Sequence, residues 1–160
     1  MPEIDDGDLS PEYHQNKKNI PAKVFTGLSY VIVTAVEGGS YTRDDYRTWK
    51  DYGHADRNDG SFYAAVTVIP NRHGPYADVE KDRLPEIRVT PEWFHAQLTK
   101  LVLKSMSMID DDGKSAPLRG RLLKNAMLLL MGDEEVPGDC DVVDSGALLQ
   151  AAVYGEVIYG

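Results

Sequence analysis

The stretch at residues 86–102, EIRVTPEWFHAQLTKLV, passes from a strand pattern to a helix pattern within a few residues. Residues 86–89 are compatible with a short strand. Thr90 is a suitable helix cap, Pro91 fits the first helical position, and Glu92 favours the positive end of a helix. Four apolar residues then follow at helical spacings: Phe94, Leu98, Leu101 and Val102. Their single stripe predicts a helix that covers a sheet.

Two earlier segments predict the other strands of an antiparallel sheet. In residues 41–49 charged side chains separate the aromatic ones, and residues 62–69 form an apolar run with high β-propensity. Residues 50–60 and 70–85 are crowded with Asp, Asn, Gly and Pro, which favour turns. We therefore expect a sheet of about three strands joined by two exposed loops.

A helix is predicted before the sheet. Apolar residues recur at helical spacings up to Glu37. Thr26 or Ser29 could cap the start of this helix, and Gly38 and Gly39 could end it in a left-handed conformation. The β-branched residues in the same segment leave a strand as the alternative.

Further helices are predicted after the sheet. One runs from near Leu118 to Gly132, is apolar around more than half of its surface, and should be the most buried helix. Another begins near Val142 and ends at Gly155. The expected fold class is α+β, with a small antiparallel sheet of about three strands, one helix before it and three helices after it.

The length of 160 residues suits one domain. We expect a single globular α+β domain over residues 24–160, preceded by a flexible acidic and polar arm at residues 1–23, because the arm has no apolar period.

The net charge of −9 makes this an acidic protein, which phosphate backbones and anionic membrane surfaces would repel. Nonspecific nucleic-acid binding and membrane binding are therefore not expected. The longest apolar run, residues 126–131, is far shorter than the ~20 residues of a membrane span. One cysteine cannot close an internal disulfide and no secretory signal is evident, so we expect a cytoplasmic protein.

Sequence motifs for catalysis are lacking. The sequence has no phosphate-binding glycine loop and no Gly-x-Ser-x-Gly nucleophile motif. Cys140 is flanked by Asp139, Asp141 and Asp144, whose charges should raise the pKa of its thiol. An enzyme is not favoured, and no cofactor is expected.

A metal site is one candidate for chemistry in the predicted loops. Imidazole and carboxylate groups together suit zinc, manganese or iron, and they occur at His54, Asp56, Asp59 and His73. Their spacing matches no known motif, and a solvated loop has the same composition. If the four side chains converge, they would form the centre of a metal-dependent hydrolase.

A ligand surface is the second candidate. Paired glycines allow a ligand to approach the backbone, and aromatic and arginine side chains can hold a nucleotide-type small molecule. The residues of this predicted surface are Gly38, Gly39, Tyr41, Arg43, Arg47 and Trp49. The alternative is that the glycines only end a helix and that the aromatic residues pack at the edge of the sheet.

A partner surface is the third candidate. An acidic loop can imitate nucleic acid and occupy a basic cleft of a host or defence protein. The acidic residues of this predicted surface are Asp133, Glu134, Glu135, Asp139 and Asp141. The β-rich tail at residues 156–160 is also compatible with a homodimer.

Two segments resemble a known group of proteins. Residues 37–41, EGGSY, lead into an aromatic segment, and residues 154–160, YGEVIYG, end the sequence. Both are similar to small proteins of unassigned function from tailed bacteriophages, especially those of actinobacteria. Those proteins usually have a Tyr-Trp pair where this sequence has Tyr41 and Thr42. The resemblance implies a cytoplasmic role in the infected cell and supplies no catalytic residues.

The expected function is therefore a phage-encoded, non-enzymatic binding protein. It would sequester a nucleotide-type signal or inhibit a host or defence protein, as in host takeover or counter-defence. A metal-dependent hydrolase and a structural phage component are the alternatives.

Overall fold

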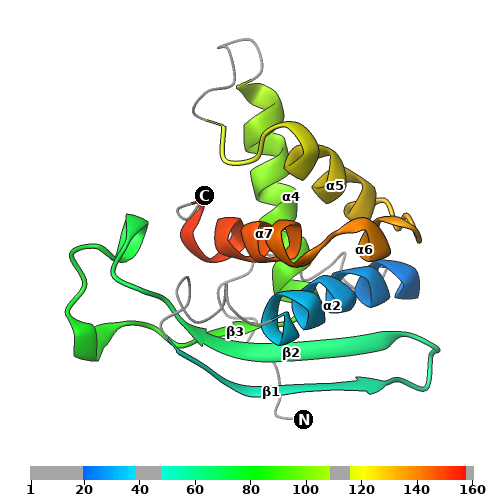
Figure 1. Ribbon diagram of the computed structural model, residues 1–160, viewed down its shortest axis with the longest axis horizontal. Helices are drawn as coiled ribbons and strands as arrows, with labels where there is room; N and C mark the ends of the chain where they lie inside the picture. Colours follow the sequence, from blue (N-terminus) through cyan, green and yellow to red (C-terminus); the bar gives the residue numbers. More distant parts are fainter. Residues whose placement is uncertain (1–19, 39–47, 109–115, 158–160) are drawn as a thin grey trace.

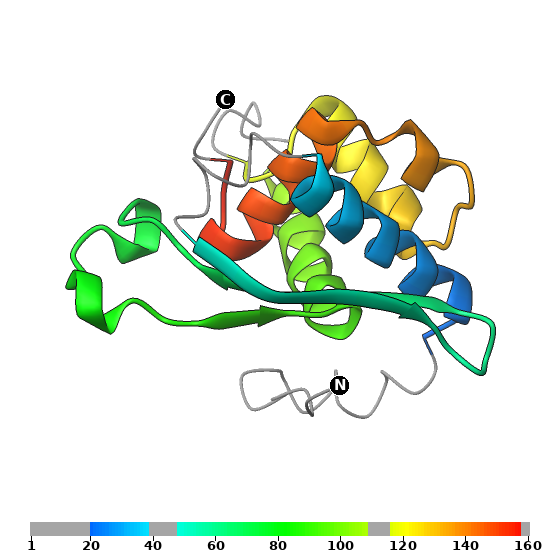
Figure 2. The ribbon, with the colours of Figure 1, turned by 60° about the horizontal axis from the view of Figure 1, so that its bottom comes forward.

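The computed structural model describes residues 20–38, 48–108 and 116–157. Its elements, in chain order, are α2 (Ala22–Glu37), β1 (Thr48–Asp56), β2 (Phe62–Ile69), η2 (Gly74–Tyr76), η3 (Lys81–Arg83), β3 (Ile87–Val89), α4 (Pro91–Ser107), α5 (Gly120–Leu130), α6 (Val136–Asp139) and α7 (Val142–Tyr154). Figure 1 shows the sheet as one layer and the α-helices stacked on one of its faces, and Figure 2 shows the same two layers from another side. The predicted α+β fold class is confirmed.

The sheet has the order β1-β2-β3, and both strand pairs are antiparallel. The side chains of Ala64, Val66 and Val68 on the central strand join the hydrophobic core. The strands β2 and β3 match the predicted positions closely.

The first strand lies later in the chain than predicted. β1 begins at Thr48 and continues to Asp56, so most of the predicted loop at residues 50–60 is a strand. Residues 41–47 lie outside the described residues. β1 forms at an edge of the sheet, where polar residues remain in solvent while the backbone pairs with β2. Its register shifts between Lys50 and Gly53, where Asp51 has a positive φ of 52°.

The helix before the sheet is confirmed against the strand alternative and ends at Glu37 as predicted, but it begins earlier than expected. α2 begins at Ala22 after Pro21, so the predicted boundary at residue 24 falls inside a helix. Gly38 follows the helix in a right-handed conformation, with φ −67° and ψ −13°, rather than the predicted left-handed one. Residues 1–19 and Gly39 lie outside the described residues.

The two predicted caps of α2 have a different role. The hydroxyl of Thr26 accepts a hydrogen bond from the N–H of Phe62 at 3.0 Å, and the hydroxyl of Ser29 accepts one from the N–H of Ala64 at 3.1 Å. β3 pairs with β2 only from Val66 onward. The hydroxyls of α2 therefore satisfy backbone donors of β2 ahead of the segment that pairs with β3.

The helix after β3 is confirmed. The hydroxyl of Thr90 accepts a hydrogen bond from the N–H of Trp93 at 3.0 Å, and Pro91 occupies the first turn. Phe94 and Leu98 are fully buried, as the apolar stripe predicts.

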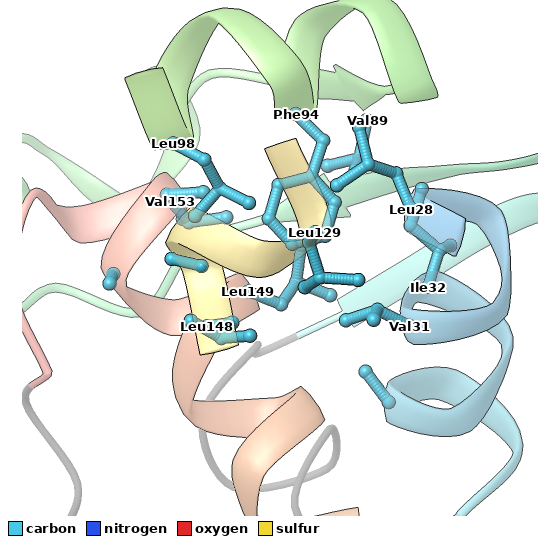
Figure 3. Close-up of a cluster of buried hydrophobic side chains, with 14 of the residues drawn as sticks. Leu28, Val31, Ile32, Val89, Phe94, Leu98, Leu129, Leu148, Leu149 and Val153 are labelled. Atoms are coloured by element: carbon cyan, nitrogen blue, oxygen red, sulfur yellow. The ribbon is translucent and has the colours of Figure 1, made fainter. Parts of the chain in front are cut away.

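The most buried helix is α7, not the helix at residues 118–132. Every residue of α7 from Asp144 to Tyr154 is buried, whereas α5 buries only Asn125, Ala126 and Leu129. α7 contacts α2, α4 and α5, and Figure 3 shows Leu148 and Leu149 within the core cluster, near residues from α2, α4 and α5. Gly155 ends α7 with a left-handed φ of 81°, as predicted.

The predicted acidic loop between α5 and α7 contains the short helix α6. Among the described residues, no helix combines the length and the apolar character that crossing a membrane requires.

Candidate functional site

A groove of about 830 Å³ lies between the outer face of α2, the turn that joins β1 to β2, and the segment that carries α6. α6 lies beside α2 in Figure 1. The two helices approach each other closely in the groove lining, where a Cβ atom on Gly27 would come within 3.2 Å of Cγ of Pro137. Glycine at this position therefore allows the α6 segment to pack against α2.

The largest side chain that lines the groove is Tyr30. The residue is 47% exposed, although its ring stacks on Phe62 with 4.8 Å between ring centroids and 24° between ring planes. The groove thus contains an aromatic surface that is held in place by a second ring and is still accessible to solvent.

Four carboxylates also line the groove: Asp59, Asp133, Glu134 and Asp141. A single lysine, Lys23, accompanies them among the described lining residues. The aliphatic part of the Lys23 side chain packs where a side chain on Gly132 would lie, since a Cβ atom there would come within 2.7 Å of Cε. The charge of the groove is therefore predominantly negative.

Backbone hydrogen bonds fix three of these carboxylates. Oδ1 of Asp133 accepts from the N–H groups of Glu135 and Val136, and Oδ1 of Asp141 accepts from the N–H of Asp144. Oδ1 of Asp59 accepts from both the N–H and the hydroxyl of Ser61 at 2.9 and 2.6 Å, and these bonds lower the pKa of Asp59. The aspartates are therefore oriented before any ligand binds.

Some of the residues of the predicted partner surface line this groove. Asp133, Glu134 and Asp141 line it, whereas Glu135 and Asp139 are exposed on the same segment outside the lining. The opposite wall, formed by Lys23, Tyr30 and other residues of α2, was not predicted. The available signal was a large aromatic residue on the polar face of an amphipathic helix.

Cys140 also borders the groove but is buried. Burial raises the pKa of its thiol to about 11, and the charges of Asp144, Asp141 and Asp139 contribute to the same shift. The predicted direction is confirmed, and the thiol stays protonated at neutral pH.

A row of aromatic rings continues from Tyr30 along the sheet. The ring of His54 lies 5.3 Å from that of Phe62, and the rings of Tyr52 and His54 are 5.9 Å apart. The hydroxyl of Tyr52 donates to Oε2 of Glu37, and Nε2 of His54 lies 3.8 Å from the same oxygen. Burial, followed by this hydrogen bond, raises the pKa of Tyr52.

The predicted ligand surface is described only in part, because Gly39, Tyr41, Arg43 and Arg47 lie outside the described residues. A Cβ atom on Gly38 would clash with the carbonyl oxygen of Thr34 and come within 2.7 Å of the Val142 side chain, so the end of α2 and its packing on Val142 account for this glycine. Trp49 is 39% exposed and packs edge-on against the ring of Tyr52, with 5.9 Å between centroids.

The predicted metal ligands are separated in space. His54 and Asp56 lie on β1 and Asp59 lies in the following turn, whereas His73 comes after the far end of β2. Within residues 20–38, 48–108 and 116–157, no group of three or more His, Cys, Asp or Glu side chains is arranged to hold a metal ion. The described structure therefore does not bring these four residues together.

No family model, curated protein or solved structure matches this chain. The resemblance to small phage proteins stays a prediction.

Proposed function

We propose that the protein is a non-enzymatic binding protein whose groove receives a positively charged segment of a partner protein. The observation that carries this proposal is that four carboxylates and an accessible aromatic ring line the same groove. An aromatic anchor surrounded by charged groups is a common arrangement in protein interfaces.

The charge of the groove favours a protein partner over a nucleotide-type ligand. Carboxylates attract lysine and arginine side chains and repel phosphate groups. Because the acidic residues surround a concave surface, a projecting segment of the partner fits this site better than a broad basic cleft does. In the infected cell that the phage resemblance implies, such a partner would be a host or defence protein, inhibited when its basic segment is bound.

The alternatives have less support. A metal-dependent hydrolase would need His73 and Asp59 to approach each other from opposite ends of the β1–β2 hairpin. A structural phage component would form a stable high-order assembly, and a homodimer would have twice the mass of the chain. Native mass spectrometry of the purified protein distinguishes these states.

A defined probe tests the proposed function. We expect a fluorescent peptide of alternating leucine and lysine to bind, and a peptide with glutamate in place of lysine not to bind, when fluorescence anisotropy is measured. Binding should weaken strongly as salt is raised above about 0.1 M, because surface charges are then screened beyond roughly 10 Å.

Matched variants locate the binding site. Asp133→Asn, Glu134→Gln and Asp141→Asn together remove groove charge while amide side chains still cap the backbone. The control set is Asp78→Asn, Glu80→Gln and Asp82→Asn. It removes the same number of negative charges from exposed residues between β2 and β3, at the other end of the β1–β2 hairpin. Only the first set should lose binding. Equal loss in both sets, or binding that does not depend on salt, would contradict the proposal.

A further inference from the structure

We infer that the partner segment inserts an arginine, rather than a lysine, into the groove, with its guanidinium group stacked on the ring of Tyr30 and hydrogen-bonded to the surrounding carboxylates. This inference rests on the proposed function and specifies the chemistry of the partner.

The ring of Tyr30 provides the stacking surface. One face of the ring is covered by Phe62, yet the residue remains 47% exposed and lines the groove. The face turned away from Phe62 is therefore the accessible one. Phe62 is in turn supported by His54, with 5.3 Å between the ring centroids, so the tyrosine ring is backed by more than one side chain.

The carboxylates provide the hydrogen-bond acceptors. In Asp59, Asp133 and Asp141, the bonds from neighbouring backbone groups all go to Oδ1. These bonds orient each side chain, and the second oxygen of each carboxylate can accept from a ligand. Acceptors held in this way suit a planar donor with several N–H groups.

Arginine matches both features better than lysine does. A guanidinium group stacks on an aromatic ring while its edge donates paired hydrogen bonds to a carboxylate. An ammonium group is a compact, strongly hydrated charge that cannot stack in this way. A groove that contained only carboxylates would favour arginine less, because it would offer the guanidinium group no ring on which to stack.

A guanidinium group stacks on a tyrosine ring elsewhere in this protein. The guanidinium carbon of Arg57 lies 3.7 Å from the ring centroid of Tyr63. At Tyr30 the ring and the carboxylates are present, and the guanidinium group would come from the partner.

The test compares two peptides that differ only in their cationic residue. The leucine–lysine probe and its leucine–arginine counterpart are titrated with the full-length protein, and dissociation constants are measured by fluorescence anisotropy. We expect the arginine peptide to bind roughly fivefold to tenfold more tightly. Tyr30→Leu should weaken this preference because the stacking surface is lost, whereas Tyr30→Phe should retain it because the ring remains.

Leu103→Ala is the control, since Leu103 is an exposed apolar residue on α4, outside the groove lining. It should keep the arginine preference, and circular dichroism checks that each variant is folded. Equal affinity for the two peptides, with both lost in the groove-charge variant, would overturn this inference and leave the proposed function standing. Absence of binding by both peptides would overturn the proposed function itself.

Discussion

The hydroxyl oxygen of Ser29 on α2 accepts a hydrogen bond from the backbone N–H of Ala64 on β2, with 3.1 Å between donor and acceptor. Both residues are fully buried. Because β3 pairs with β2 only from Val66 onward, the helix supplies the acceptor that a neighbouring strand would otherwise provide. This bond links the helix that carries Tyr30 to the central strand of the sheet.

Ser29→Ala should destabilise the protein, because the buried N–H of Ala64 would lose its acceptor. We expect the free energy of unfolding in urea to fall by about 1–3 kcal/mol. Ser107→Ala is the control, since Ser107 is exposed near the end of α4 and its hydroxyl donates to the carbonyl of Lys104. A loss of similar size in both variants would show that the Ser29 bond has no special role.

Local signals explain which elements could be predicted from the sequence. Thr90 and Pro91 define the start of α4 through bonds made within one helical turn, and Gly155 ends α7 through its own backbone conformation. β1 could not be placed in the same way, because Lys50, Asp51 and Gly53 have little preference for strands. Pairing with the buried strand β2 determines the conformation of that segment.

Only one wall of the groove could be predicted from the sequence. Asp133 and Asp141 were predicted as a binding surface because acidic residues cluster in the sequence there. Lys23 and Tyr30, on the other wall, are more than a hundred positions away, and only the packing of α6 on α2 brings the two walls together. A hydrophobic pattern predicts that a helix is amphipathic, but it does not identify the segment that borders its polar face.

Gly38→Ala tests whether Gly38 serves packing rather than ligand binding. The new Cβ atom would clash with the carbonyl oxygen of Thr34 and lie within 2.7 Å of the Val142 side chain, so we expect the last turn of α2 to be distorted and its packing on the start of α7 to be disturbed. The cost should be about 1–3 kcal/mol in the free energy of unfolding. Gly138→Ala is the control, because nothing lies within 4 Å of the equivalent Cβ position. Unchanged stability in Gly38→Ala would reopen the interpretation of this glycine as a ligand contact.

Arg121→Gln should destabilise the junction of α5 and α7. Nη2 of Arg121 donates to Oδ1 of Asp144 at 2.8 Å, and the Asp144 side chain is only 6% exposed. Loss of the partner would leave a nearly buried carboxylate unpaired. Because Arg121 itself is largely exposed, we expect a loss of about 1–3 kcal/mol rather than the larger cost of a fully buried pair.

Urea denaturation measures this effect, and a double-mutant cycle checks its origin. With Asp144→Asn already present, Arg121→Gln should have little further effect. Lys124→Gln, an exposed position on the same helix, should be nearly neutral. Additive effects of the Arg121 and Asp144 substitutions would rule out the ion pair as the cause.

Cys140 should make stability depend on pH in the alkaline range. The pKa of its thiol rises from 9.0 to about 11 in the folded protein, so the folded state retains the proton more strongly than the unfolded state does. Its contribution to stability is complete below the unfolded pKa and is lost as pH rises through the folded pKa. The free energy of unfolding should therefore fall between pH 9 and about 11.

Cys140→Ala isolates this contribution, because other alkaline groups titrate in both proteins. The decline in unfolding free energy should be less steep in the variant. Iodoacetamide should also label the folded thiol more slowly than the unfolded thiol at the same pH, since the thiolate is the reactive form. Identical pH profiles for the two proteins would refute the assignment.

Lys23→Met should strengthen binding of the leucine–lysine probe. Lys23 is a cation among four carboxylates in the groove lining, and it repels any basic segment that enters. Methionine keeps an apolar side chain over Gly132, so the packing of α2 on this segment should be preserved. We expect affinity to rise roughly twofold to fivefold, the range for a partly exposed charge, and the gain should diminish in high salt.

Lys104→Met removes the same charge from an exposed position on α4 and should leave affinity nearly unchanged. Because a damaged fold does not bind more tightly, a gain in Lys23→Met alone would place the probe in this groove, whereas equal effects of the two substitutions would mean that binding responds only to net charge.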